Sequence, residues 1–255
     1  MVTNVDSDTD ALIQRERINK SARYDLDEWI FRQIRLDSGI KVLDLGCGTG
    51  KQIFALWKLL SSDSMITGVD ISAAAVAKVN ERAKGEELQN IKAAICEHEG
   101  VVNHFKGACF DLIMSSYAIY YAKDMIELLS SLSSLLNRKG QVFVCGYGQG
   151  TNQEMHEIIK MFCAPNHHIT EFEDDFISEN EIVDIARNYS SYQVVRLPNQ
   201  IYFDSPDSLL IWWKNHNLYV PEILQQVCDA IDQHFRVNGS FTLTKNVIGI
   251  RFDAK

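Results

Sequence analysis

Short runs of consecutive apolar residues recur along the first part of the chain, and segments of helical periodicity separate them. The runs lie at Lys41–Leu45, Met65–Asp70, Ile91–Cys96, Phe110–Ser115 and Gln141–Cys145. Helical patterns follow, for example at Lys51–Leu60, Ala73–Ala83 and Met125–Leu136. Strands without polar alternation are buried on both faces, and strands that alternate with helices form parallel sheets. The pattern therefore predicts an α/β fold with a doubly wound, mostly parallel sheet.

The ends of the chain add helices and two further strands to this prediction. Asp10–Leu36 is predicted to form one or two amphipathic N-terminal helices, and residues 151–188 are mostly helical in pattern. Pro206 and Pro221 are expected to open helices that run to His216 and Phe235, because proline suits the first helical position. Tyr192–Leu197 and Phe241–Phe252 are predicted strands that pair with each other and complete a seven-stranded sheet with helical insertions.

Glycine and proline divide the chain near residue 150. Twelve of the 14 glycines lie at or before Gly150, and all four prolines lie after it. Glycine occurs where the backbone turns tightly or approaches a ligand, so residues 1–150 are predicted to hold the N-terminal helices and a ligand-binding core. Residues 151–255 are predicted to supply helices that cover a substrate and the last strands of the same sheet, within a single structural domain.

Charge and composition narrow the range of partners. The net charge is −9, with 34 acidic and 25 basic residues. A protein that binds nucleic acid or an anionic membrane usually has excess Lys and Arg, so we expect a small-molecule partner and neither nucleic acid nor membrane. The six cysteines form no C-x-x-C pair and no zinc-like Cys/His cluster, so we expect no metal. No apolar segment has the length of a signal peptide or a membrane span, so the protein is expected to be cytoplasmic.

The segment Val42–Gly50, VLDLGCGTG, is the most informative part of the chain. It places Asp44 near the end of a buried strand, follows it with glycines at every second position, and leads into a helix. A dinucleotide-binding loop would read G-x-G-x-x-G, but here the third glycine, Gly50, comes one residue early. Asp44 would also repel a pyrophosphate and attract a cation. A P-loop is excluded because no G-K-[ST] follows.

This segment resembles the first motif of class I S-adenosylmethionine-dependent methyltransferases, which commonly reads V-L-D-L-G-C-G-T-G. The resemblance covers about residues 20–146 and implies a Rossmann-like methyltransferase fold with S-adenosylmethionine as cofactor and S-adenosylhomocysteine as product. The cofactor-binding residues that it implies in the loop are Asp44, Gly46, Cys47 and Gly48.

The end of the second strand matches the family where an acidic residue accepts hydrogen bonds from both ribose hydroxyls. Asp70 lies 20 residues after Gly50, and Ile71 follows it in the implied site. The alternative is that Asp70 caps the next helix, a role for which Ser72 is better placed.

Other implied cofactor contacts depart more from the family. Glu97 falls on the aspartate that accepts from the adenine amino group, although glutamate is longer and Cys96 replaces a glycine; the alternative is an exposed loop acid. The backbone amide of His98 would lie beside adenine N1, and Ser115 near the methionine half. Tyr24 resembles a tyrosine in a helix that often covers the cofactor. A packing role for Tyr24 is an equally good alternative.

Aromatic residues are the candidates for the acceptor site. The run that ends the fourth strand places Tyr120 and Tyr121 where the family has residues facing the acceptor, and Tyr117 is a further candidate lining residue. Trp212 and Trp213, from the second part, are further candidate lining residues. The tandem His167-His168 is expected on the surface, because adjacent helical residues point apart and no third metal ligand is evident.

We therefore predict O- or N-methylation of a small-molecule acceptor by in-line displacement. A weak resemblance of Phe203–Lys214 and the segments after it to trans-aconitate-type methyltransferases agrees with this prediction. An RNA or protein methyltransferase is an alternative, but residues 115–118 are Ser-Ser-Tyr-Ala and not an N/D-P-P-Y type tetrapeptide. A non-catalytic S-adenosylmethionine-binding module is another alternative. The oligomeric state, monomer or homodimer, stays open.

Overall fold

The structure, a computed structural model, describes Gln14, residues 21–163 and residues 174–255. The chain forms two compact units. The larger comprises Leu26–Gly146, Phe176–Val195 and Ile248–Lys255; the smaller comprises the described residues of Met1–Asp25, Tyr147–Asp175 and Arg196–Val247. We call them the large-sheet unit and the small-sheet unit, after the sheet that each contains. His167 and His168 lie outside the described residues.

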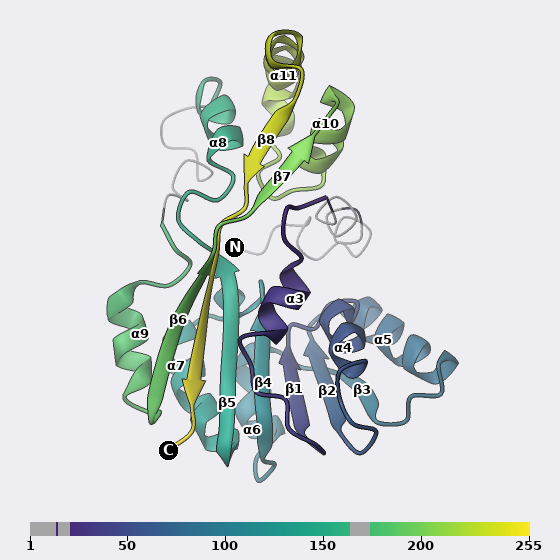
Figure 1. Ribbon diagram of the computed structural model, residues 1–255, viewed down its shortest axis with the longest axis vertical. Helices are drawn as coiled ribbons and strands as arrows, with labels where there is room; N and C mark the ends of the chain where they lie inside the picture. Colours follow the sequence, from purple (N-terminus) through teal and green to yellow (C-terminus); the bar gives the residue numbers. More distant parts are fainter. Residues whose placement is uncertain (1–13, 15–20, 164–173) are drawn as a thin grey trace. The chain divides into compact units, whose positions relative to one another are not determined.

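A seven-stranded sheet of order β3-β2-β1-β4-β5-β9-β6 forms the centre of the large-sheet unit (Figure 1). Its strands are β1 (Lys41–Leu45), β2 (Met65–Asp70), β3 (Ile91–Ile95), β4 (Phe110–Ser116), β5 (Leu136–Tyr147), β6 (Ser191–Leu197) and β9 (Val247–Asp253). The pairs β1–β2, β1–β4, β2–β3 and β4–β5 are parallel. This confirms the predicted doubly wound sheet. The strand order reverses between β1 and β4, and in such folds ligands bind beyond the carboxyl ends of the strands at this point.

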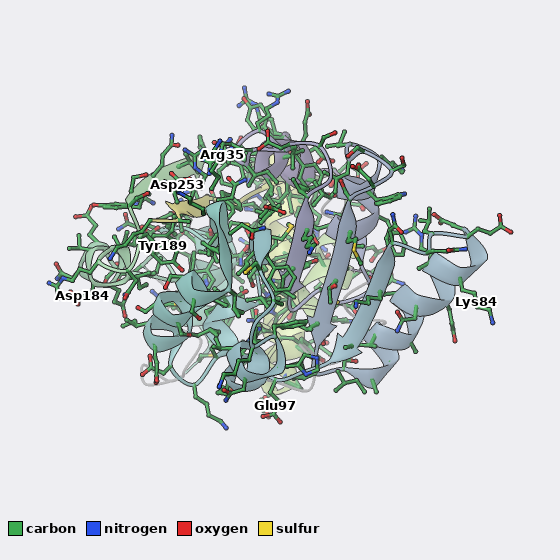
Figure 2. The ribbon with its side chains drawn as sticks, turned by 90° about the horizontal axis from the view of Figure 1, so that it is seen from below. Arg35, Lys84, Glu97, Asp184, Tyr189 and Asp253 are labelled. Atoms are coloured by element: carbon green, nitrogen blue, oxygen red, sulfur yellow. The ribbon has the colours of Figure 1, made fainter. Side chains whose placement is uncertain are left out.

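The central strands are buried because their apolar runs face both sides of the sheet. Leu43 of β1 and Leu112 and Ile113 of β4 have no exposed surface. The helices of this unit are α3 (Leu26–Phe31), α4 (Lys51–Trp57), α5 (Ala73–Gly85), α6 (Val101–His104), α7 (Met125–Ser131) and α9 (Glu179–Ala186). Away from the glycine loop, Arg35 and Asp253 form an ion pair of 2.6 Å that ties the segment before β1 to the end of β9 (Figure 2).

The small-sheet unit has its own core. Strands β7 (Gln200–Phe203) and β8 (Phe241–Thr244) form an antiparallel pair. Its helices are α8 (Gln153–Lys160), α10 (Pro206–Lys214) and α11 (Leu224–Asn238). Pro206 opens α10 as predicted, and the predicted helix at Pro221 begins as a 3₁₀ turn that leads into α11. No helix among the residues that the structure describes is long and apolar enough to cross a membrane.

Several predicted elements differ from the structure. The predicted strand Phe241–Phe252 is two strands, β8 and β9, which lie in different sheets. They separate at Asn246, whose carbonyl accepts from the Gly148 amide and the Thr151 hydroxyl. The pairing of the C-terminal strand with Tyr192–Leu197 is confirmed, because β9 and β6 are neighbours. Strand β7 was not predicted.

Some predicted helices are shorter than expected. The helix predicted over Met125–Leu136 ends at Ser131 and continues as a 3₁₀ turn to Leu135, and Leu136 already belongs to β5. Within the described part of Asp10–Leu36, α3 covers only Leu26–Phe31, and Ala22 instead forms a β-bridge with Ile201.

Candidate active site

The glycine loop turns sharply between the end of β1 and the start of α4. Gly46, Gly48 and Gly50 have φ of 71°, 51° and 83°, a region that glycine adopts without a steric penalty. The amides of Gly46 and Cys47 both donate to the Val69 carbonyl, at 2.8 and 3.0 Å. A Cβ atom on Gly46 would lie 2.2 Å from the Cβ of Ala118, in the turn after β4. The loop is therefore held against both neighbouring strands, and Gly46 leaves no room for a side chain.

Asp44 is a buried acid beside this loop. Its side chain is 2% exposed, and its Oδ2 atom has no hydrogen-bond partner among the described residues. Burial, and secondarily the negative charge of Asp70, raises the pKa of Asp44 to about 7. A buried carboxylate without a partner is costly, and a cation beside it removes that cost. Asp44 therefore fits a positively charged ligand and does not fit a phosphate.

Asp70 joins the end of β2 to the glycine loop. Its Oδ2 accepts from the Gly48 amide at 2.8 Å, and its Oδ1 accepts from the Ser72 amide at 2.9 Å. Ser72, and not Asp70, caps α5, because the Ser72 hydroxyl accepts from the Ala75 amide. Each carboxylate oxygen accepts one backbone bond and keeps a further lone pair, so Asp70 can still accept from a pair of ligand hydroxyls. The adjacent Ile71 is 56% exposed.

Cys47 contributes its backbone to the loop and turns its side chain inward. The side chain is 5% exposed, and a Cβ atom on Gly68 would lie 2.7 Å from its sulfur. Gly68 on β2 therefore makes room for Cys47. Burial, with the nearby negative charges of Asp44 and Asp70, raises the pKa of the thiol, so the sulfur stays protonated and is a poor nucleophile.

Glu97 and His98 follow β3, at the same edge of the parallel sheet where Asp70 ends β2. The Glu97 side chain is exposed, with no hydrogen-bond partner among the described residues, and lies at the lower edge of the unit in Figure 2. His98 begins a 3₁₀ turn (His98–Gly100) and is partly buried. Its Nε2 lies 3.7 Å from the position that a Cβ atom on Gly46 would occupy. Sequence reasoning considered only the His98 backbone and missed this side-chain placement.

The carboxyl end of β4 holds one buried hydroxyl and three tyrosines. Ser115 is 1% exposed, and its hydroxyl donates to the Leu45 carbonyl at 2.8 Å, which ties β4 to β1. Its predicted contact with the methionine half of the cofactor stays a prediction. Tyr117 has φ of 56°, an unusual value for a bulky residue, and burial raises the pKa of its phenol. The rings of Tyr120 and Tyr121 lie 4.8 Å apart, and Phe176 lies 5.9 Å from Tyr120.

The aromatic candidates in the small-sheet unit have different surroundings. Tyr24 has an exposed ring, while its backbone donates to and accepts from the side-chain amide of Asn199, at 3.0 and 2.9 Å. Its predicted contact with the cofactor stays a prediction. Trp212 and Trp213 are 1% and 0% exposed. The Trp213 indole donates to the Leu218 carbonyl at 2.8 Å. Both tryptophans form the core of this unit, so the prediction that they line a site was wrong.

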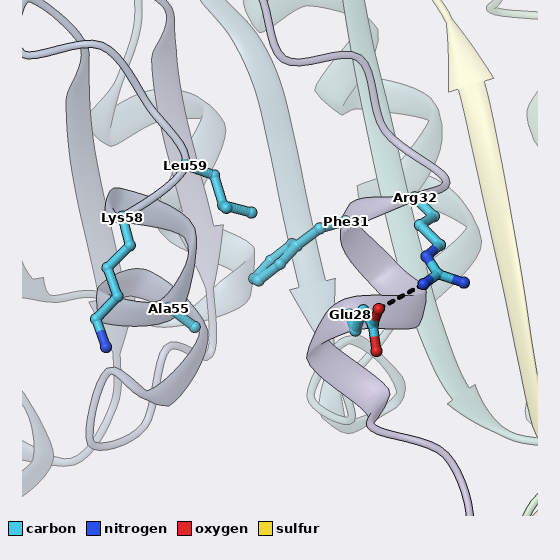
Figure 3. A pocket seen from close by; sticks show the side chains of 6 residues that line it. All are labelled: Glu28, Phe31, Arg32, Ala55, Lys58 and Leu59. Carbon is cyan, nitrogen blue, oxygen red and sulfur yellow. Dashed lines mark hydrogen bonds and ion pairs between the residues drawn. The ribbon is translucent and has the colours of Figure 1, made fainter.

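A separate pocket of about 450 Å³ lies between α3 and α4 (Figure 3). It is lined by Glu28, Phe31, Arg32, Ala55, Lys58 and Leu59, and Glu28 and Arg32 form an ion pair on its α3 side. Lys58 and Leu59 follow the C-terminal end of α4, whereas the glycine loop precedes its N-terminus. No predicted site residue lines this pocket. Among the described residues, no group of three or more His, Cys, Asp or Glu side chains could hold a metal.

The chain is similar to known methyltransferases. The family model of a methyltransferase domain matches residues 36–194, more than half of the chain. Over 105 residues the chain is 28% identical to aklanonic acid methyltransferase DauC of Streptomyces sp. strain C5, covering 41% of this chain and 47% of that protein. It is 26% identical over 143 residues to the malonyl-[acyl-carrier protein] O-methyltransferase of Bacillus anthracis, covering 56% and 51%. The chain thus spans about half the length of these relatives.

Solved structures share the fold at low sequence identity. The YcgJ protein of Bacillus subtilis superimposes with a TM-score of 0.62 and 16% identity, over 90% of this chain and 97% of that one. Phosphoethanolamine N-methyltransferase 2 of Haemonchus contortus, solved with phosphomonomethylethanolamine and S-adenosylhomocysteine, gives 0.61 and 15%, over 97% and 58%. With the family match and the glycine loop beside Asp44 and Asp70, these findings show that the chain belongs to the class I, S-adenosylmethionine-dependent methyltransferase family.

Proposed function

We propose that the protein methylates an oxygen or nitrogen atom of a small-molecule acceptor, with S-adenosylmethionine as methyl donor. When bound, S-adenosylmethionine supplies an electrophilic methyl group on a positively charged sulfur. The observation that carries the proposal is Asp44, a buried carboxylate whose Oδ2 has no partner among the described residues and which adjoins the glycine loop. A negative charge at this place favours a cationic ligand over a dinucleotide.

The surrounding residues are assigned to the cofactor by their chemistry. Asp44 balances the positive charge of the methionine half, and the backbone of Gly46, Cys47 and Gly48 lies against it. Asp70 keeps free lone pairs for the ribose hydroxyls, and the exposed Ile71 packs on the adenine side. The amides of Gly46, Cys47 and Gly48 are held in place by hydrogen bonds within the chain, as is the Ser72 amide after β2.

Contacts to the adenine are assigned to the segment after β3. The Glu97 carboxylate is exposed and accepts from the adenine amino group, and the His98 backbone amide lies beside the ring nitrogen. Ser115 is a weaker candidate for the methionine half, because its hydroxyl is already used between β4 and β1.

The acceptor is assigned to the tyrosines after β4. Because the pKa of Tyr117 is raised by burial, its phenol stays protonated at neutral pH and can donate a hydrogen bond but cannot act as a base. Tyr120 and Tyr121 follow it in the chain and offer aromatic surface, with their rings 4.8 Å apart. A carboxylate acceptor needs no general base, so this set of residues suits an organic acid best. The names of the aklanonic acid and malonyl-carrier methyltransferases support the same class of acceptor.

Overall charge supports a small acceptor. The net charge of −9 is unfavourable for binding the phosphates of RNA, which basic residues usually neutralise. Residues 115–118, at the end of β4, also lack the tetrapeptide typical of enzymes that methylate flipped bases.

The test is methyl transfer from methyl-labelled S-adenosylmethionine into a fractionated metabolite extract, with the acceptor identified by mass spectrometry. We expect label in a small organic acid, much less label with Asp44→Asn, and unchanged label with the control Glu81→Gln, an exposed acid on α5. Binding of the cofactor without any transfer would favour a non-catalytic binding module. Label in RNA or protein alone would contradict the proposed acceptor.

A further inference from the structure

The imidazole of His98 lies against the glycine loop. Its Nε2 is 3.7 Å from the position that a Cβ atom on Gly46 would occupy, and the same position is bounded by the Cβ of Ala118. His98 directly follows Glu97, and the negative charge of Asp70 acts on its ring. The ring therefore lies beside the loop after β1 and the turn after β4.

The His98 imidazole makes no hydrogen bond that would give it a structural role in the described part of the chain. Neither ring nitrogen has a hydrogen-bond partner among the described residues, and the residue is only partly buried. Burial lowers the pKa of His98, and the charges of Glu99 and Asp70 oppose this effect. The neutral ring offers one donor and one acceptor, so it can bind a polar, uncharged group in either direction.

We propose that the His98 side chain binds the nucleoside half of the cofactor through a hydrogen bond to the ribose or the adenine. This inference rests on the proposed function, and it adds a side-chain contact to the one assigned to the His98 backbone. Its place directly after Glu97, which is assigned to the adenine, favours the nucleoside over the methionine half, whose positive charge is matched by Asp44.

Two ligands distinguish binding of the nucleoside half of the cofactor from binding of its amino-acid half. S-Adenosylhomocysteine contains both halves, whereas 5′-methylthioadenosine contains the nucleoside and lacks the amino-acid part. Isothermal titration of the full chain with each ligand measures whether a variant affects one half or both. His98→Ala removes the ring, and His98→Leu keeps much of its volume without a polar atom. His104→Ala is the matched control, because His104 is exposed on α6.

We expect His98→Ala and His98→Leu to bind both ligands about 3- to 10-fold more weakly, by the same factor for each, because one hydrogen bond is lost. His104→Ala should bind both as the wild type does. Equal affinity of His98→Leu and the wild type for 5′-methylthioadenosine would overturn the inference, as would a loss confined to S-adenosylhomocysteine. If the wild type binds neither ligand, the proposed function itself fails. Near-ultraviolet circular dichroism of each variant verifies that it is folded.

Discussion

The carboxylate of Asp70, at the end of β2, accepts a 2.8 Å hydrogen bond from the backbone amide of Gly48, in the loop after β1. One acid therefore shapes the glycine loop before any ligand arrives. The Gly46 and Cys47 amides are held in the same way by the Val69 carbonyl. The end of β2 thus determines the path of the loop, and the residues assigned to the ribose and to the methionine half depend on each other.

Removal of this carboxylate should weaken cofactor binding strongly. Asp70→Ala loses the bond to Gly48 and the predicted bonds to the ribose, and we expect a loss of S-adenosylmethionine affinity of about 10- to 100-fold. Asp70→Asn keeps one accepting oxygen and should lie between Asp70→Ala and the wild type. Calorimetric titration measures the affinities, with Glu81→Gln on α5 as the control. Wild-type affinity in Asp70→Ala would disprove the role of this acid.

Gly46 should tolerate no side chain. Gly46→Ala places a Cβ atom 2.2 Å from that of Ala118 and keeps a φ of 71° that alanine rarely adopts. We expect the free energy of unfolding to fall by about 2–4 kcal/mol, as measured by urea denaturation. Gly85→Ala is the matched control, because nothing lies within 4 Å of a Cβ atom there and the residue ends α5. It should leave stability unchanged or raise it by up to about 1 kcal/mol.

Asp44 should make the ligand-free protein less stable as the pH rises. The pKa of Asp44 is about 7 in the folded chain, and its ordinary value, which applies to the unfolded chain, is 3.8. Between these pH values the folded state holds a proton on Asp44 that the unfolded chain has lost. Stability contributed by the protonated acid is therefore lost from about pH 4 to about pH 7. Asp44→Asn carries no charge and should remove this loss.

At pH 8 the ligand-free Asp44→Asn variant should be more stable than the wild type, by up to about 4 kcal/mol. At pH 4 the two should be similar. Thermal and urea unfolding at both pH values measure the difference. A wild-type pH profile that Asp44→Asn leaves unchanged would show that another group is responsible.

Asn199 should hold the segment around Tyr24 in the small-sheet unit. Its side-chain amide pairs with both backbone groups of Tyr24. In Asn199→Ala we expect the Tyr24 amide to exchange with solvent deuterium at least about 10-fold faster, because opening no longer breaks these bonds. Asn215→Ala is the control, because Asn215 bonds only the exposed end of α10 at Ile211. Unchanged exchange at Tyr24 would mean that the β-bridge of Ala22 with Ile201 suffices.

The central sheet was predictable because its local signals agree with one another. The buried run Val42–Leu45, the alternating glycines and the acid that ends β2 each indicate the same structure. Errors arose where one pattern fits two structures. Leu135 and Leu136 continue a helical pattern and also begin a buried strand. Alternation across Phe241–Phe252 does not reveal that Asn246 bonds to residues from Gly148 to Thr151.

The site was predictable in its backbone and less so in its side chains. The family motif located Asp44, Asp70 and the glycines, because their roles follow from position in the loop. It did not locate the Ser115 hydroxyl, which bonds within the sheet, or the His98 ring, which lies over Gly46. Trp212 and Trp213 were predicted to line the acceptor site, yet their indoles complete a hydrophobic core. Such contacts depend on residues distant in sequence.

Titration calorimetry of S-adenosylmethionine into the wild type and Asp44→Asn, at pH 6 and pH 8, tests the central claim most directly. A cation favours the charged form of Asp44, whose pKa is about 7 in the folded chain. Wild-type affinity should therefore rise severalfold from pH 6 to pH 8, whereas Asp44→Asn should bind at least about 10-fold more weakly at pH 8 and respond less to pH. A wild type that does not bind, or an Asp44→Asn variant that matches it at both pH values, would contradict the account.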